Sequence, residues 1–192
     1  FIAAARGVNP DLRLHASPWS PPGWMKTTGT IDGGGAFVDE PAMHRAYALY
    51  LRRYVEAYRD RHGIRIDRLM PQNEPDSATA EHKPGAFPTC LMPPQVMVRL
   101  VCEYLGPQFE RAGLPTELWG GTFRTMTGLQ SHRCMASAAF RDTVAGCGFQ
   151  YAFPQHLHEL RHLYPDKALM HTESICHDSA NSIAQAAGLL LD

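Results

Sequence analysis

The stretch that decides the fold runs from residue 41 to residue 74, PAMHRAYALYLRRYVEAYRDRHGIRIDRLMPQNE. Its first part begins at Pro41 and repeats apolar and aromatic side chains at three- and four-residue steps, which predicts a helix with one apolar face. Gly63 ends this pattern, as glycine commonly ends helices. The apolar run over 64–69 then predicts a strand that leads into a polar segment. The repeating helical positions are Met43, Tyr47, Tyr50, Leu51, Tyr54 and Tyr58.

The same alternation of strand and helix continues on both sides of this stretch. Because no hairpin signal interrupts it, the alternation predicts a parallel sheet with right-handed crossovers. Two architectures remain open at this point: an open doubly wound sheet, or part of a (β/α)8 barrel, which needs roughly 250 residues when complete. The other predicted strands lie near 12–16, 116–122, 144–151 and 168–172, and the other predicted helices near 97–112 (kinked or split at Pro107), 132–142, 155–163 and 180–191.

Composition limits the kinds of protein that this chain can be. Its 192 residues predict a single unit over 1–192 with a sizeable core, and a formal net charge of −1 argues against a nucleic-acid binder. No run of 18 apolar residues occurs, so we expect no membrane-spanning helix. The 5 cysteines form no C-x-x-C pair, which argues against a thiolate zinc site. The chain begins at Phe1 without a charged leader, so we expect a mature product or an internal piece.

Two glutamates occupy comparable places in this pattern. Glu74 follows the strand that ends at 69–73, and Glu173 follows the strand over 168–172. Ligands bind at the carboxyl ends of strands in parallel α/β folds, and a pair of acids there suits cleavage of a glycosidic bond. The amide of Asn73 can hold a sugar hydroxyl beside Glu74. Either glutamate alone is more simply explained as a helix cap or a loop ion pair, and only the pair together favours a site.

Several motifs resemble those of glycoside hydrolase family 30, the glucosylceramidase family. Residues 16–27, ASPWSPPGWMKT, resemble the signature of its third barrel strand. Residues 72–75, QNEP, resemble its acid/base segment, and 172–174, TES, resemble its nucleophile segment. Leu-Gly-Pro at 105–107 resembles the start of an intervening helix. The spacing between the two acidic segments fits three strand–helix units.

The resemblance implies a retaining β-glycosidase on a (β/α)8 TIM barrel, represented here by about strands 3 to 7. In that family pattern Glu74 would be the general acid/base and Glu173 the nucleophile, with carboxyl groups about 5–5.5 Å apart. Asn73 would bind the sugar 2-hydroxyl, and Trp19 would line the sugar subsite. The implied substrate is a β-glycoside such as glucosylceramide or a β-glucan, and neither cofactor nor metal is implied. Family members are commonly secreted or lysosomal, so the resemblance suggests a secreted or extracellular protein.

One segment departs from the family pattern. The family usually has His-Trp-Tyr at the end of its sixth strand, and the tyrosine supports the nucleophile. Here residues 149–152 are Phe-Gln-Tyr-Ala. Two possibilities follow: Tyr151 supports Glu173 from a shifted position, or Gln150 contacts the sugar.

Two other functions compete with this interpretation. His158, Glu159 and His162 match H-E-x-x-H, the helical motif of zinc metallopeptidases. The apolar side of that helix, at Leu157, Leu160 and Tyr164, places both histidines on the solvated side, and no third ligand follows at the expected spacing. The second alternative is a non-catalytic carbohydrate-binding relative that keeps only the aromatic subsite.

Overall fold

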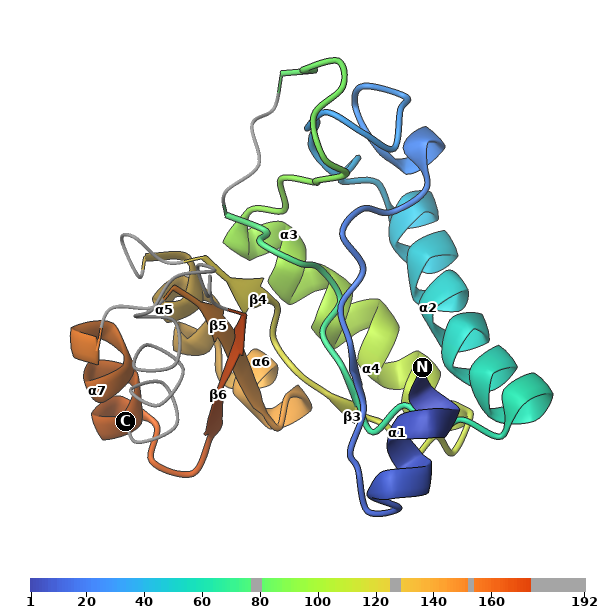
Figure 1. The fold of residues 1–192 in the computed structure, drawn as a ribbon. Coiled ribbons are helices and arrows are strands. Elements are labelled where there is room, and N and C mark those ends of the chain that lie inside the picture. The colour runs from blue at the N-terminus through green and yellow to red at the C-terminus, as the bar shows by residue number, and fades with distance from the viewer. Residues whose placement is uncertain (77–80, 125–128, 152–153, 174–192) are drawn as a thin grey trace, which may run out of the picture.

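The computed structural model describes residues 1–76, 81–124, 129–151 and 154–173 (Figure 1). Short strands alternate with helices along the chain, as the sequence predicts. The strands are β1 (His15–Ala16), β2 (Arg68–Leu69), β3 (Glu117–Leu118), β4 (Thr122–Phe123), β5 (Gly146–Gln150) and β6 (Ala168–Glu173). The α-helices are α1 (Ile2–Val8), α2 (Pro41–His62), α3 (Pro94–Arg99), α4 (Gly106–Arg111), α5 (Leu129–Ala136), α6 (Ala138–Thr143) and α7 (Pro154–Leu163), with a 3-10 helix at Gly23–Met25 and a π-helix at Leu100–Leu105.

All strand pairings between these elements are parallel. One ladder has the order β1-β2-β3 and the other the order β4-β5-β6. The segment 117–123 joins them, because it carries both β3 and β4 and the N–H of Gly120 donates to the carbonyl of Gly146 at 2.8 Å. Within each ladder every strand therefore lies beside its neighbour in the sequence, and the shared segment makes the two ladders continuous.

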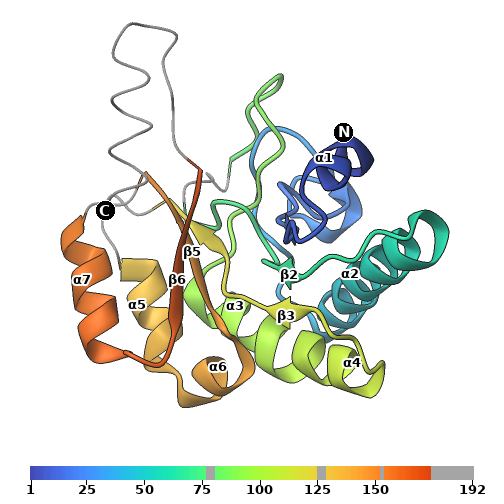
Figure 2. The same ribbon diagram turned by 60° about the horizontal axis from the view of Figure 1, so that its bottom comes forward.

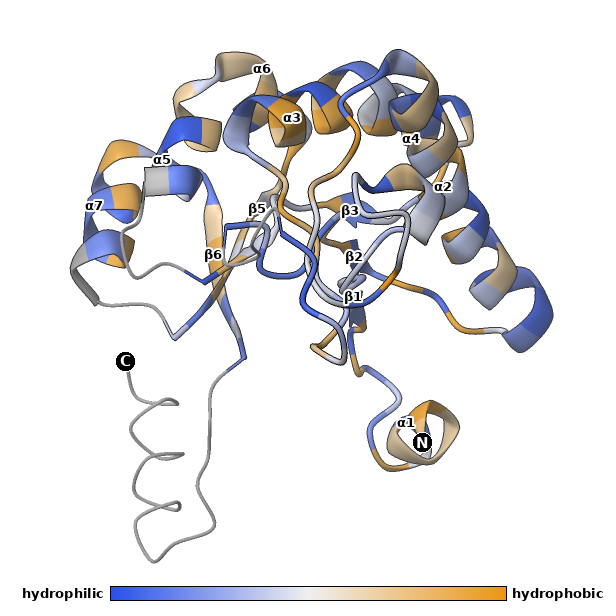
Figure 3. Cartoon of the chain, turned by 90° about the horizontal axis from the view of Figure 1, so that it is seen from above, coloured by the Kyte–Doolittle hydropathy of each residue, from blue (hydrophilic) through white to orange (hydrophobic). Residues whose placement is uncertain are grey.

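This strand order decides between the two predicted architectures. A doubly wound sheet reverses its order part-way, whereas here every crossover leads to the next strand in the same direction. Right-handed crossovers of that kind place all the helices on one face. Figures 2 and 3 show α2 to α7 in an arc outside the strands, with α1 alone on the opposite side. The fold is therefore that of an incomplete α/β barrel.

Helix α2 begins and ends where the sequence predicts. Pro41 occupies its first turn, where a missing N–H costs nothing, and Gly63 ends it with φ of 62°, the left-handed conformation that suits glycine. Tyr47 and Leu51 are fully buried between this helix and the sheet. The hydroxyl of Tyr47 donates to the carbonyl of Pro71 at 2.9 Å, so the helix is tied to the segment that leads to Glu74.

Pro107 divides the second long helix, as predicted, but through a π-helical segment. Residues 100–105 form the π-helix, and α4 then begins at Gly106 with Pro107 in its first turn. Proline has no N–H to donate and its ring clashes with the carbonyl four residues earlier, so a wider turn before it relieves both problems. The segment still buries Leu100, Val101 and Leu105.

Some predicted elements differ from the structure. The predicted helix near 132–142 is two helices, because the Ser137 hydroxyl accepts a hydrogen bond from the Phe140 N–H and starts α6. The strands β1 and β2 are shorter than their apolar runs. Helix α1 was not predicted, and it buries none of its residues. The helix predicted near 180–191 lies outside the described residues.

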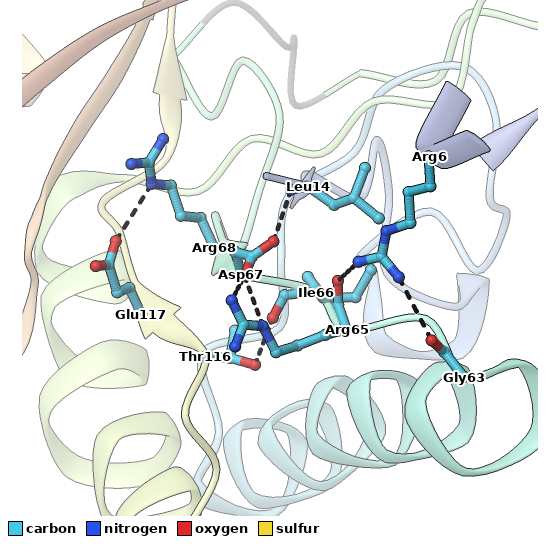
Figure 4. A network of polar contacts seen from close by, with 9 residues as sticks. All are labelled: Arg6, Leu14, Gly63, Arg65, Ile66, Asp67, Arg68, Thr116 and Glu117. Carbon is cyan, nitrogen blue, oxygen red and sulfur yellow. Dashed lines mark hydrogen bonds and ion pairs between the residues drawn. The ribbon is translucent and has the colours of Figure 1, made fainter. Parts of the chain in front are cut away.

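Polar contacts hold the amino-terminal edge of the first three strands (Figure 4). The Leu14 N–H donates to Asp67 Oδ2 at 2.8 Å, and Thr116 Oγ1 donates to the Ile66 carbonyl at 2.7 Å. Arg6 of α1 donates to the carbonyl of Gly63 at 3.4 Å. These bonds fix the register of strands that are each only two residues long.

The loops at the opposite edge of the sheet pair with each other. Residues 32–36 form isolated bridges with residues 82–91, and the Lys83 N–H donates to the Gly33 carbonyl at 2.7 Å. Gly33 has φ of 68°, and a Cβ there would collide with Lys83, so glycine is required at this close approach. The paired loops stand above the carboxyl ends of the strands. Among the described helices, none is long and apolar enough to cross a membrane.

Candidate active site

Glu74 lies directly beyond the carboxyl end of β2. Asn73 bridges to Thr122 of β4 in parallel register, and the Glu74 N–H donates to the Thr122 carbonyl at 2.9 Å. The backbone then turns sharply, because Glu74 has φ of 44°. A side-chain-bearing residue in this left-handed region stores strain that surrounding structure must hold, and such residues concentrate at functional sites. Only 15% of the Glu74 side chain is exposed.

Glu173 is the last residue of β6, next to β5, and Tyr151 holds its carboxylate. The Tyr151 hydroxyl donates to Glu173 Oε1 at 3.1 Å. Tyr151 follows β5 and also has a left-handed φ, of 49°. Burial, the hydrogen bond to Glu173 and the negative charges of Glu173 and Glu74 raise the pKa of Tyr151, so its phenol keeps the proton that it donates. Of the two possibilities for this segment, the structure therefore shows Tyr151 beside Glu173.

One pocket of about 360 Å³ contains both glutamates. They reach it from strands that are not adjacent, because all strands run the same way and their carboxyl ends meet at one edge. Asn73 and Tyr151 line the same pocket. With Trp19, the structure thus brings together the two acids and three of the four further residues that the sequence singled out.

Aromatic side chains form one wall of this pocket. Trp19 lines it with 45% of its surface exposed, and its ring meets that of Phe87 edge-on, with centroids 5.9 Å apart. Phe87 belongs to the loop over 82–91 and is 74% exposed. Exposed aromatic faces are suited to packing against the C–H surfaces of a sugar.

Sequence reasoning missed Arg124, which connects the two sides of the pocket. Its guanidinium lies 3.7 Å from Glu74 Oε2, and its centre is 5.3 Å from the Tyr151 ring centroid. The backbone N–H of Arg124 donates to Asp76 Oδ1 at 3.0 Å, which fixes the backbone at Arg124. A signal was available, because Arg124 directly follows β4 as Glu74 and Glu173 follow their strands.

Gln150 has a different place from the other predicted site residues. Its side chain is 1% exposed and lies behind Asn73, where Gln150 Nε2 donates to Asn73 Oδ1 at 2.6 Å. Gln150, with Asn73 and Glu173, also lines a smaller cavity of about 180 Å³ next to the pocket. Gln150 therefore contacts Asn73, which lines the larger pocket, but does not line that pocket itself.

The H-E-x-x-H segment lies on α7, on the outside of the fold. Leu160 is fully buried, whereas His158, Glu159 and His162 are exposed, as the apolar pattern predicts. The Glu159 carboxylate lies 3.2 Å from His132 Nε2. Among the described residues, no group of three or more metal-ligating side chains is placed to hold an ion.

Comparison with known proteins gives the family. Residues 1–113 match the sequence profile of the glycosyl hydrolase family 30 TIM-barrel domain. The chain belongs to glycosyl hydrolase family 30. The matched part contains Trp19, Asn73 and Glu74, while Tyr151 and Glu173 lie beyond it.

Individual members of family 30 agree with this assignment. Endo-1,6-beta-D-glucanase BGN16.3 of Trichoderma harzianum is 33% identical over 128 residues, covering 62% of this chain and 25% of its own. Putative glucosylceramidase 3 of Caenorhabditis elegans is 37% identical over 108 residues, covering 56% of this chain and 20% of its own. The chain therefore spans a quarter or less of these relatives.

A solved structure supports the fold over nearly the whole chain. SrfJ from Salmonella typhimurium superimposes with a TM-score of 0.81 and 28% identity, and the alignment covers 96% of this chain and 41% of that one. The likeness includes the part of the chain beyond the family profile match, where Tyr151 follows β5 and Glu173 ends β6.

Proposed function

We propose that this chain carries the catalytic centre of a retaining β-glycoside hydrolase that acts by double displacement. Glu74 is the general acid/base and Glu173 the nucleophile. The chain corresponds to about strands 3 to 7 of the barrel, as a partial catalytic domain over 1–192. The observation that carries the proposal is the single pocket that holds both carboxylates above the ends of parallel strands.

Each half of the reaction needs one of the two acids in a specific state. Glu173 attacks the anomeric carbon while Glu74 gives its proton to the leaving oxygen, so the glycosidic bond breaks as the glycosyl-enzyme bond forms. Glu74, now ionised, then takes a proton from water, and the resulting hydroxide displaces Glu173 from the sugar. The proton ends on Glu74, ready for the next cycle.

The surroundings of Glu173 support its role as nucleophile. A hydrogen bond from Tyr151 fixes one carboxylate oxygen at 3.1 Å and leaves the other to attack. A group that is oriented before the substrate arrives needs little reorganisation in the transition state. Asn73, directly before Glu74, is placed to hold a hydroxyl of the same sugar, and Trp19 and Phe87 supply apolar surface for its ring.

The proposed substrates are β-glucosides, and two kinds follow from the relatives' names. One relative is called an endo-1,6-β-glucanase and another a putative glucosylceramidase. The pocket suits the glucosyl unit that these substrates share, and the paired loops at 32–36 and 82–91 border it. Comparing hydrolysis of a β-1,6-linked glucan with that of glucosylceramide distinguishes the two.

The test is hydrolysis of aryl β-glucosides by variants of the full-length protein. Glu173→Gln abolishes turnover on every leaving group, because no nucleophile remains. Glu74→Gln keeps kcat/KM on a dinitrophenyl glucoside, whose leaving group needs no protonation, and loses it on an alkyl glucoside. Its kcat falls on both, because water then attacks the glycosyl-enzyme without a base. Glu159→Gln is the matched control, since this glutamate is exposed on α7 and belongs to the competing zinc motif.

Three results would contradict the proposal. Full activity in Glu173→Gln removes the assigned nucleophile. Loss of activity in Glu159→Gln together with inhibition by a chelator favours a zinc enzyme. A wild-type protein that binds glucosides without cleaving them is a non-catalytic carbohydrate-binding relative.

A further inference from the structure

A buried cluster of three side chains lies behind the pocket and includes Asn73. Thr122 Oγ1 donates to Asn73 Oδ1 at 2.8 Å, and Gln150 Nε2 donates to the same oxygen at 2.6 Å. Gln150 Nε2 also lies 3.2 Å from Thr122 Oγ1. The exposed fractions are 8% for Asn73 and 1% for each of the other two, so water competes little for these bonds.

These contacts determine which end of the Asn73 amide faces the pocket. Two donors occupy the oxygen Oδ1, so the NH2 group is left for the pocket side. An amide can present either a donor or an acceptor, and its neighbours decide which. The Thr122 hydroxyl accepts from the Glu74 N–H at 3.4 Å, which directs its own hydrogen toward Asn73.

This arrangement leaves one polar atom of Gln150 in an unfavourable environment. Its oxygen Oε1 is buried and, among the described residues, has no hydrogen-bond partner. A buried acceptor without a partner is unfavourable. Turning the Gln150 amide would not help, because Oε1 would then face Asn73 Oδ1, and two acceptors repel at that distance. The short bond to Asn73 therefore sets the orientation of Gln150.

We propose that Gln150 is a positioning residue that fixes the Asn73 amide with its NH2 group toward the sugar. Asn73 then donates to a substrate hydroxyl beside the scissile bond, which the family resemblance implies is the 2-hydroxyl. Gln150 acts without touching the substrate. This inference rests on the proposed glycoside substrate. It adds Gln150 as the residue that makes Asn73 a donor toward the sugar, so that the site selects a substrate with a hydrogen-bond acceptor there.

The test compares substrates with and without the 2-hydroxyl in the full-length protein. Gln150→Met keeps the length and neutrality of the side chain but removes the donor to Asn73. We expect kcat/KM on an aryl β-glucoside to fall about tenfold, as for the loss of one well-placed hydrogen bond, while kcat/KM on the 2-deoxy glucoside changes less than about twofold. A purely structural effect would lower both equally.

A control variant and a binding measurement keep the test decisive. Gln130→Met removes a similar amide bond, from Gln130 Nε2 to the Met92 carbonyl at 2.5 Å, away from the pocket, and leaves both activities unchanged. Dissociation constants for a sulfur-linked glucoside and its 2-deoxy form do not depend on turnover. Gln150→Met weakens binding of the first and not the second.

The outcomes separate the two proposals. Wild-type protein that binds the sulfur-linked glucoside but hydrolyses nothing disproves the proposed function, while the binding comparison still tests Gln150. Equal effects of Gln150→Met on both members of each substrate pair, or no effect on either, overturn the positioning role.

Discussion

Replacing Tyr151 by phenylalanine removes one hydroxyl from the candidate active site and little else. The hydroxyl donates to Glu173 Oε1 at 3.1 Å. The aromatic ring remains under Arg124, whose guanidinium lies 5.3 Å from its centroid. The variant therefore isolates the hydrogen bond that holds the proposed nucleophile.

The size of the effect follows from the charge of the acceptor. A hydrogen bond to a charged group contributes about 1.5–3 kcal/mol, more than one between neutral groups. One decade in rate corresponds to about 1.4 kcal/mol. If the whole contribution is lost in the transition state, kcat/KM on an aryl β-glucoside falls about 10- to 150-fold.

The assay needs a control for the loss of a tyrosine hydroxyl as such. Tyr164 offers one, because its ring lies under Arg141 at 5.0 Å, an arrangement similar to that of Tyr151 and Arg124, but next to α7 and outside the pocket. Tyr164→Phe is expected to keep wild-type kcat/KM. Circular dichroism melting of both variants shows whether either change disturbs the fold.

A small decrease in kcat/KM would refute this reasoning. A decrease of less than about threefold in Tyr151→Phe, with Tyr164→Phe at the wild-type value, means that the bond contributes less than a hydrogen bond to a charged group should. Glu173 would then be held by other groups, and the support for its role as nucleophile would be lost.

Three further predictions concern stability and metal dependence. Burial acts to raise the pKa of Asp67, but hydrogen bonds from the Leu14 N–H and from Arg65 outweigh it, so the pKa is lowered from 3.8. The ionised carboxylate therefore stabilises the fold above that value, and this stabilisation is lost as the pH falls below it. In Asp67→Asn the free energy of unfolding should depend less on pH below about pH 4. Phe140→Ala, at a fully buried position, should reduce the free energy of unfolding in denaturant by about 3–5 kcal/mol, whereas a loss below about 1 kcal/mol would contradict its place in the core. Chelators should leave glucoside hydrolysis unchanged, and inhibition reversed by zinc would instead support a role for His158 and His162.

Local sequence was sufficient where one segment carries its own signal. The bounds of α2 follow from Pro41 and Gly63, and its buried face follows from the spacing of Tyr47 and Leu51. Such patterns depend only on helix geometry and on local backbone preferences, so no distant residue is needed to interpret them. The exposed histidines of α7 were predicted by the same argument.

Local sequence was less informative where neighbouring elements decide the outcome. The strands are shorter than their apolar runs because pairing partners, and not residue type, determine where a ladder begins. Helix α1 buries no residue and is bonded through Arg6 to the Gly63 carbonyl, far along the chain. The boundary between α5 and α6 could have been predicted from Ser137, which caps the start of α6.

The sequence by itself determined the alternation of strands and helices and the positions of Glu74 and Glu173 after two of those strands. Only the tertiary structure decided the sequential order of the strands, the single pocket, the bond between Tyr151 and Glu173, and the placing of Gln150 behind Asn73. The physical reason is that pattern and propensity act over a few residues, whereas strand neighbours and their register are set by hydrogen bonds and packing between segments that are distant in the chain.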